Sequence, residues 1–531
     1  MQSFAARERA ERGLMFHTIR LASLSGLQAV EALFDRLFGA RANPWRHLGA
    51  LGFLLFWIVA ASGIYLYVVL DTSVEGVYQS IEHLSRAQWY FGGVVRSLHR
   101  YASDGFMAVM VLHLLRELLQ GRFHSFRWFT WVSGVPLLWL SLAAGVVGFW
   151  IVWDQLAQFS AIASTEWLDA LKVFAEPLTR NFLTPGAVND RFFSLLVFLH
   201  IGLPLLVLLG LWIHIQRVSR PDTRPAPALT WGTLAALIGL SLVVPVQSMP
   251  PADLSMVPAA LNLDWFYLAP NALTYWWSPA ALWWLAAGLT AVLVALPWMP
   301  RHERQALAVV DPSNCNGCGR CFADCPYGAI TMQPHTDRRR GAELAVVDSS
   351  LCASCGICAG ACPSSTPFRS VAELVSGIDM PRLPIGQLRS RLKLQIARLK
   401  GEAKVVVFGC DHAADVRALQ ASDTAVASLL CIGQLPPSFV EYALRQGADG
   451  VLVTGCGECD CAFRLGNDWT EQRLRAEREP HLRRTVRPNE LRLIWAGKDG
   501  VSLQRELAEF RQELKQGGSV GRSEEQDCGY A

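Results

Sequence analysis

Two cysteine runs have the residue types and spacing most clearly suited to chemistry in this sequence of 531 residues. Each run has three cysteines at intervals of three residues, and each ends in Cys-Pro four residues later. The members are Cys315, Cys318, Cys321 and Cys325 in the first run and Cys352, Cys355, Cys358 and Cys362 in the second. Thiolates at this spacing hold iron–sulfur clusters. Structural zinc is the alternative, and the repeated Cys-Pro ending disfavours it.

The repeated run resembles the motif of bacterial ferredoxins that carry two [4Fe-4S] clusters. In that family the fourth cysteine of each run crosses over to the other cluster. The resemblance therefore implies one cluster on Cys315, Cys318, Cys321 and Cys362, and a second on Cys352, Cys355, Cys358 and Cys325. We expect an α+β ferredoxin domain over residues 301–370.

A further group of cysteines follows short apolar runs within residues 402–515, which we assign to an α/β domain. The runs 405–408, 426–430 and 451–453 have the length and composition of buried strands. The cysteines that follow them are Cys410, Cys431 and Cys456, with Cys459 and Cys461 close behind. Because ligands bind at the carboxyl ends of parallel strands, four or five thiolates should converge on one iron–sulfur or zinc centre.

The segments 447–453 and 455–461 resemble the delta subunit of methyl-viologen-reducing hydrogenase. The resemblance implies a [2Fe-2S] cluster and an electron relay to flavoproteins of the heterodisulfide-reductase type. The candidate ligands are Cys410, Cys431, Cys456 and Cys461, with Cys459 as a substitute. The family usually has a second cysteine shortly after the first, where this sequence has Asp411 and His412.

Histidines are the candidate metal ligands in the first three hundred residues, which contain no cysteine. His99 and His113 lie fourteen residues apart on one expected helix, and His200 and His214 have the same spacing on another. Fourteen residues make just under four turns, which places each pair on one helix face about 21 Å apart. Two such helices can clamp two planar cofactors, and imidazole is a common axial ligand of haem iron. Histidines that only bridge helices are the alternative, which the matched pairs disfavour.

Glycines repeat this spacing on two other apolar segments. The pairs are Gly49 with Gly63 and Gly134 with Gly148. Glycine lets a cofactor edge approach the backbone, although it is also common where membrane helices pack together. Because the period matches that of the histidines, the glycines favour the haem interpretation.

Long apolar runs supply the helices that position these residues. The chain is 52% hydrophobic and 18% charged, which points to a membrane protein and excludes intrinsic disorder. Runs long enough to cross a bilayer cover 48–70, 131–153, 192–214, 229–250 and 276–300. A sixth run, near 91–115, is interrupted by ionisable residues, which are costly at membrane depth and therefore suggest function. We expect an all-α bundle of about six helices over 48–300, preceded by an amphipathic segment over 1–47 with a solvated arm as its alternative.

The loop charges predict the orientation of the bundle. Arginines are concentrated before the first helix and in the segments 116–127 and 217–224, whereas 71–90 has one arginine and 248–275 has none. By the positive-inside rule, both termini and the iron–sulfur domains face the cytoplasm. The expected location is the cytoplasmic (inner) membrane, with multiple passes.

Residues 1–300 resemble cytochrome b of the quinol-oxidising bc complexes. The resemblance is carried by the stretches 93–99, 148–155 and 191–194, and by Asp264-Trp-Phe, where the family has Glu-Trp-Tyr. It implies that His99 and His200 bind the outer b-type haem, and that His113 and His214 bind the inner one. It also implies that Asp264 is a catalytic carboxylate near the outer quinone, with an ordinary loop aspartate as the alternative. Arg96 and Arg100 are candidate partners of the haem propionates, with simple snorkelling as their alternative.

Together these features predict a membrane electron-transfer subunit of a quinone-linked oxidoreductase complex. A cytoplasmic flavoprotein, hydrogenase or dehydrogenase subunit would exchange electrons with the quinone pool through the [2Fe-2S] cluster, two [4Fe-4S] clusters and two haems. The alternative is a membrane anchor and relay for a hydrogenase or heterodisulfide-reductase-like complex, without quinone chemistry of its own. The net charge of +3 is too small to indicate nucleic-acid binding. Membrane lipid is an expected partner, and a homodimer is an alternative to a single copy in the complex. Residues 371–401 are expected to form a linker and 516–531 a polar tail.

Overall fold

The computed structural model describes residues 22–182, 188–218, 221–258, 260–264, 266–299, 306–335, 342–458 and 460–516. The chain divides into two compact units, Met1–Gln216 with Asp222–Met299, and Arg217–Pro221 with Pro300–Ala531. Several residues considered above lie outside the described residues: Trp265, Cys459, residues 1–21 of the expected amphipathic segment and residues 517–531 of the polar tail.

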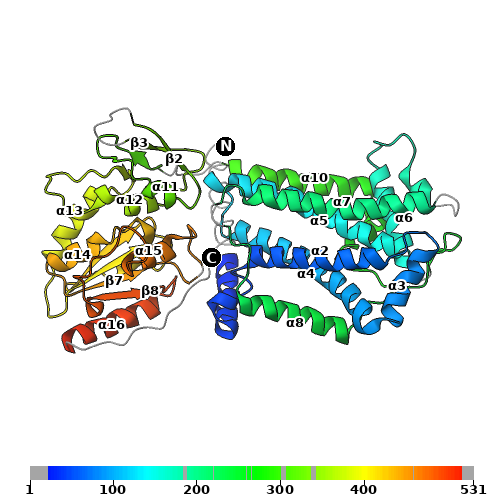
Figure 1. Ribbon diagram of the computed structural model, residues 1–531, viewed down its shortest axis with the longest axis horizontal. Helices are drawn as coiled ribbons and strands as arrows, with labels where there is room; N and C mark the ends of the chain where they lie inside the picture. Colours follow the sequence, from blue (N-terminus) through cyan, green and yellow to red (C-terminus); the bar gives the residue numbers. More distant parts are fainter. Residues whose placement is uncertain are drawn as a thin grey trace, which may run out of the picture. The chain divides into compact units, whose positions relative to one another are not determined.

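The first unit is a bundle of helices (Figure 1). Its long helices are α2 (Leu48–Val69), α4 (Val94–Leu119), α5 (Trp128–Val152), α7 (Asp190–Ile215), α8 (Pro227–Val243) and α10 (Pro279–Ala295). Shorter helices are α3 (Gly76–Arg86), α6 (Gln155–Asp169) and α9 (Ala269–Trp276). Among the described residues, α2, α5, α7 and α10 with their flanking turns are long and apolar enough to cross a membrane. Helix α8 is apolar but shorter.

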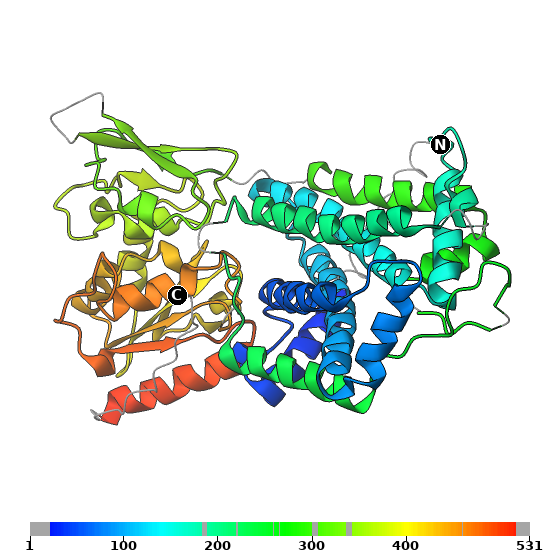
Figure 2. The same cartoon turned by 45° about the vertical axis from the view of Figure 1, so that its right-hand side comes forward.

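Helix α4 corresponds to the sixth expected span, the one with ionisable residues. It has 26 residues, enough to cross a bilayer, but it is not among the four helices that are also apolar enough. Figures 1 and 2 show α4 running beside α2, with α8 next to it, while α5 runs beside α7. The predicted membrane bundle is thus confirmed as a helical region of four to five apolar helices, with α4 as its polar member.

Short polar residues begin several of these helices. The side chain of Asp154 accepts a hydrogen bond from Ala157 N at 2.9 Å at the start of α6, and Asn189 accepts one from Phe192 N at 3.0 Å before α7. Ser278 does the same for α10, whose first residue is a proline. These side chains satisfy amide groups that have no partner inside the helix. The helix starts are therefore encoded locally, by residues that interrupt the apolar runs.

The second unit begins with the segment that contains the two cysteine runs. Strands β2 (Ile330–Pro334) and β3 (Glu343–Val347) form an antiparallel pair, and β1 (Val309–Val310) pairs with β4 (Ile378–Asp379). Two short helices, α11 (Arg320–Ala323) and α12 (Ile357–Ala361), carry the third cysteine of each run. Each follows a glycine with a positive φ, Gly319 at 71° and Gly356 at 79°, a backbone conformation that favours glycine.

A four-stranded parallel sheet forms the rest of the second unit. Its order is β6 (Thr424–Leu429), β5 (Val405–Cys410), β7 (Gly450–Thr454) and β8 (Leu491–Ile494). The associated helices are α14 (Ser438–Arg445), α15 (Gly466–Leu474) and α16 (Gly500–Gln516). The mixed α/β class predicted for this half of the chain is confirmed.

The stretch 371–401 differs from the linker expected there. It contains β4 and α13 (Ile385–Ile396), whose side chains Ile385, Leu388, Leu392 and Ile396 are buried. These side chains belong to one apolar core that also includes β5, β6 and the cysteine-run segment. Their spacing fits one face of a helix, a signal that is easily missed because the stretch has no continuous apolar run. This stretch is therefore part of the folded unit.

Candidate metal and cofactor sites

The four histidines lie on two helices, His99 and His113 on α4 and His200 and His214 on α7. The ring centroids of His99 and His200 are 6.3 Å apart, with 69° between the ring planes. Two imidazoles that bind one metal from opposite sides, with metal–nitrogen bonds of about 2 Å, have centroids roughly 6 Å apart. The spacing of this pair therefore fits two axial ligands of one iron atom.

The Nδ1 atoms of three of these rings face groups on the neighbouring helices. His99 Nδ1 lies 3.0 Å from Val59 O, and His200 Nδ1 lies 3.0 Å from Ala144 O. His214 Nδ1 lies 3.1 Å from Ser133 Oγ. When Nδ1–H donates to a carbonyl oxygen, the lone pair stays on Nε2, which is then the atom available to a metal.

Each of the four predicted glycines lies against one histidine. A Cβ atom on Gly63 would be 3.0 Å from His99 Cε1, and one on Gly148 would be 2.9 Å from His200 Cε1. A Cβ atom on Gly134 would be 3.3 Å from His214 Cε1, and one on Gly49 would be 3.9 Å from His113 Cε1. The sequence suggested that glycine makes room for the cofactor edge. In the structure these positions make room for the imidazoles.

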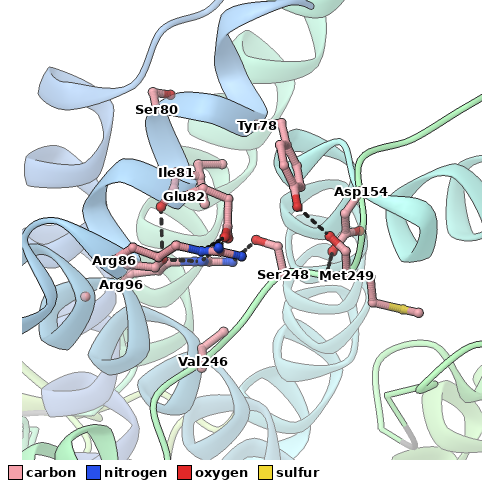
Figure 3. Close-up of polar contacts among 12 residues, drawn as sticks. Tyr78, Ser80, Ile81, Glu82, Arg86, Arg96, Asp154, Val246, Ser248 and Met249 are labelled. Atoms are coloured by element: carbon pink, nitrogen blue, oxygen red, sulfur yellow. Dashed lines mark hydrogen bonds and ion pairs between the residues drawn. The ribbon is translucent and has the colours of Figure 1, made fainter.

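Arg96, a candidate propionate partner, is held by side chains at one end of α4 (Figure 3). It is 8% exposed, donates a hydrogen bond to Ser85 Oγ, and donates another to Ser248 Oγ at 2.7 Å. Glu82 Oε1 on α3 lies 3.6 Å from Arg96 Nη1. A guanidinium has five N–H donors, so these contacts still leave donors for a carboxylate.

Figure 3 also shows how the segment after α8 is fixed beside Arg96. Tyr78 Oη donates a hydrogen bond to Met249 O at 2.9 Å, and Met249 N donates one to Asp154 Oδ2, also at 2.9 Å. Asp154, which caps α6, thus also holds the segment around Met249 in place through a hydrogen bond. The sequence resemblance marked the 148–155 stretch but did not reveal this role.

The candidate catalytic residue Asp264 forms an ion pair with Arg100, the second candidate propionate partner. Arg100 also pairs with Asp104 one turn along α4, and its guanidinium lies 4.5 Å from the ring centroid of Phe149. Asp264 Oδ1 accepts a hydrogen bond from Phe266 N at 3.0 Å. The structure therefore brings Asp264 and Arg100 together, although 164 positions separate them in the chain.

An ion cluster near His113 was missed because its arginines were used only to predict orientation. Glu117 lies 3.5 Å from Arg127, 3.7 Å from Arg122 and 3.9 Å from Arg116. Glu117 follows His113 by one helical turn, so the cluster lies beside the histidine. The available signal was an acidic residue within an otherwise basic segment.

Cysteines from both runs lie close together in the fold. One small cavity is lined by Cys315, Cys318, Cys321 and Cys362, which includes the crossing cysteine of the second run. Burial and the neighbouring thiols of Cys315, Cys318 and Cys362 raise the pKa of Cys321 to about 12. Cys352, Cys355 and Cys358 are buried together, and burial raises the pKa of Cys358 well above its usual value. Metal binding would have to displace these protons.

The thiols of the C-terminal domain meet at the carboxyl ends of the strands. Cys410 ends β5, and its thiol contacts those of Cys431 and Cys456, which lower its pKa to about 4. The thiol of Cys461 contacts the same two. A Cβ on Gly466 would lie 2.3 Å from Cys431 Sγ and 3.1 Å from Cys461 Sγ, so the site needs glycine there. In the described part of the chain, no group of three or more His, Cys, Asp or Glu is arranged to hold a single metal ion.

Comparison with known families gives three matches. Residues 34–220 match the family model of cytochrome b/b6/petB, and residues 314–366 match that of the 4Fe-4S dicluster domain. Residues 403–518 match the delta subunit of methyl-viologen-reducing hydrogenase. Among solved structures, a chain titled "Hyperthermophilic respiratory Complex III" has 19% identity, covering 47% of this chain and 74% of that chain, with a TM-score of 0.39.

The family matches define the class: a multi-pass membrane protein of electron transport with b-type haems and two [4Fe-4S] clusters. The chain contains a cytochrome b N-terminal region, a 4Fe-4S dicluster domain and a delta-subunit domain of the hydrogenase type. The three resemblances inferred from the sequence are thereby confirmed. The delta-subunit domain implies a partner in a complex.

Proposed function

We propose that this protein passes electrons between a cytoplasmic partner and membrane quinone. The observation that carries the proposal is the arrangement of four histidines on α4 and α7, each facing a glycine on α2 or α5. His99 and His200 would hold one haem, and His113 and His214 the other. When bound, the haems supply one-electron carriers at two depths, about 21 Å apart. A transfer across the membrane would couple the reaction to the membrane potential.

The partner would dock on the delta-subunit domain. Cys410, Cys431, Cys456 and Cys461 would hold a [2Fe-2S] cluster, because their thiols contact one another beside Gly466. The partner would be a flavoprotein, hydrogenase or dehydrogenase subunit, since the chain has no recognisable glycine-rich nucleotide site. This arrangement fits a subunit of a quinone-linked oxidoreductase complex.

The histidine assignment is tested by the spectrum of the purified full chain. His99→Ala should remove one of two b-type haem signals, and His113→Ala should remove the other. His83→Ala is a matched control because His83 lies exposed on α3. If both haem signals survived in the two α4 variants, the ligand assignment would be wrong.

Asp264 distinguishes quinone chemistry from the alternative of an anchor that only relays electrons. Under the proposal, Asp264 accepts a proton as quinol is oxidised, and Arg100 holds its carboxylate in place. Asp264→Asn keeps the size of the side chain and removes the base, so quinol-linked turnover should fall by about 10²-fold or more. Unchanged quinol turnover with intact haem spectra would favour the anchor.

A further inference from the structure

A fully buried arginine lies where the dicluster domain meets the delta-subunit domain. Arg473, in the last turn of α15, has 0% exposure and donates a hydrogen bond from Nη1 to Gly433 O at 2.9 Å. Its Nη2 donates to Asp324, which is 3% exposed and directly precedes Cys325. A Cβ on Gly360, two residues after Cys358, would lie 3.0 Å from Arg473 Nη1.

The two domains are packed closely around this arginine. A Cβ on Gly360 would lie 2.2 Å from Gly433 O, and one on Gly433 would lie 2.7 Å from Ile357 Cγ1. Gln434 Nε2 donates a hydrogen bond to Leu383 O at 2.9 Å. Gly433 follows Cys431 by two residues. Cys358 on α12 and Cys431 are thus each two residues from a glycine that lies against Arg473, Gly360 and Gly433 respectively.

The charges around Arg473 do not cancel. Asp324 also accepts a hydrogen bond from Arg478 Nε at 2.9 Å, so two guanidinium groups share one carboxylate. The side chain of Arg478 is 18% exposed, whereas that of Arg473 is fully buried. Water and salt screen a buried charge much less than an exposed one. These three side chains carry a net charge of +1, next to Gly360, which follows Cys358 by two residues, and also near Cys431.

We propose that Arg473 raises the reduction potential of the [4Fe-4S] cluster held by Cys325, Cys352, Cys355 and Cys358, at the junction with the delta-subunit domain. Reduction adds one electron to the cluster, and a nearby buried cation stabilises the added negative charge. The inference rests on the proposed ligand assignment for the two [4Fe-4S] clusters.

The test is a redox titration of the full chain with its clusters, followed by electron paramagnetic resonance. Arg473→Gln should shift the reduction equilibrium of one [4Fe-4S] cluster about tenfold toward the oxidised form, roughly 59 mV more negative. Arg473→Lys should restore most of the potential, because it keeps the charge. Arg475→Gln is the matched control, since Arg475 is 39% exposed and pairs with Glu471 at 2.6 Å.

Asp324→Asn gives the decisive comparison, because it leaves both arginines without their carboxylate. It should shift the same cluster in the positive direction, opposite to Arg473→Gln. If both changes lowered thermal stability but left the potential unmoved, or shifted it in the same direction, Arg473 would be only a structural clamp. If Arg473→Gln prevented cluster assembly, the shift in reduction potential caused by Asp324→Asn would be the deciding measurement. A positive shift would support the proposal, and a negative or absent shift would contradict it. A wild-type chain without two [4Fe-4S] signals would refute the ligand assignment, and this inference with it.

Discussion

At the scale of single residues, the proposed haem sites depend on small neighbouring residues as much as on the histidines. The histidine side chains come from α4 and α7, but the groups facing the Nδ1 atoms of His99, His200 and His214 come from α2 and α5. Glycine at the four facing positions removes the side chain that would push each imidazole away. We therefore expect each proposed ligand and its facing glycine to act together, which can be tested by substitution.

Gly148→Ala should disturb one haem specifically. The added Cβ would lie 2.9 Å from His200 Cε1, closer than Cβ contacts normally allow, so the imidazole must move. Overpacking of this kind costs about 1–3 kcal/mol. We expect reduced occupancy or a shifted absorbance of one b-type haem.

Gly202→Ala is the control for this prediction, since Gly202 lies on α7 close to His200 but has nothing within 4 Å of its Cβ position. Purified full chain of each variant should be compared by its reduced-minus-oxidised spectrum. Equal spectra for the two variants would contradict the role given to Gly148.

At the scale of elements, the sites are placed where helices and strands end or pair. Three parallel strands deliver Cys410, Cys431 and Cys456 to one edge of the sheet. Helix α13 and strand β4 join this domain to the dicluster domain through a shared core. The expected linker therefore contributes to stability, and its half-buried residue Asp379 makes that contribution depend on pH.

Asp379 on β4 provides the pH prediction. Burial raises the pKa of Asp379 to about 6, although its carboxylate accepts hydrogen bonds from Ile385 N and Met380 N. Because the folded-state pKa is raised, its contribution to stability is complete below about pH 4 and is lost as pH rises through about 6. Asp379→Asn should therefore stabilise the second unit by up to about 3 kcal/mol at pH 7.5, and by less at pH 5.

The measurement is thermal unfolding of the full chain in detergent at both pH values. Asp415→Asn is the control, because Asp415 is exposed and also accepts a backbone hydrogen bond, from Arg417 N at 3.0 Å. Asp415→Asn should not raise the unfolding temperature at either pH. A gain for Asp379→Asn that is equal at pH 5 and pH 7.5 would contradict the assignment to this carboxyl group.

At the scale of the whole molecule, the chain joins a membrane unit that lacks cysteine to a second unit that contains every cysteine of the protein. The proposed metal ligands change from imidazole to thiolate between the two units. Thiolates persist in a reducing compartment, and the arginine distribution gives an independent argument for the same orientation. The proposed orientation places the second unit in the cytoplasm.

Sided proteolysis tests this orientation. In inside-out membrane vesicles, trypsin should cleave the second unit, whereas right-side-out vesicles should protect it. The internal control is the exposed segment 171–177, with Lys172, which should be cleaved only in right-side-out vesicles. The reverse pattern for both segments would overturn the orientation.

The sequence by itself determined the ligand types, their spacing and the class of each domain. Cysteine runs, fourteen-residue histidine pairs and apolar runs are local patterns, because a helix or strand repeats at a fixed period along the chain. They predicted the cytochrome b region, the dicluster domain and the delta-subunit domain, all of which the family comparisons confirm.

Only the tertiary structure decided which distant residues meet. The pairing of Arg100 with Asp264 spans 164 positions and that of Arg473 with Asp324 spans 149, and no local period encodes either. The packing of α13 into a shared core likewise depends on the strands and helices that surround it. Contacts of this kind arise when preformed elements bury their apolar faces together, so the charges that shape the sites become visible only in the folded chain.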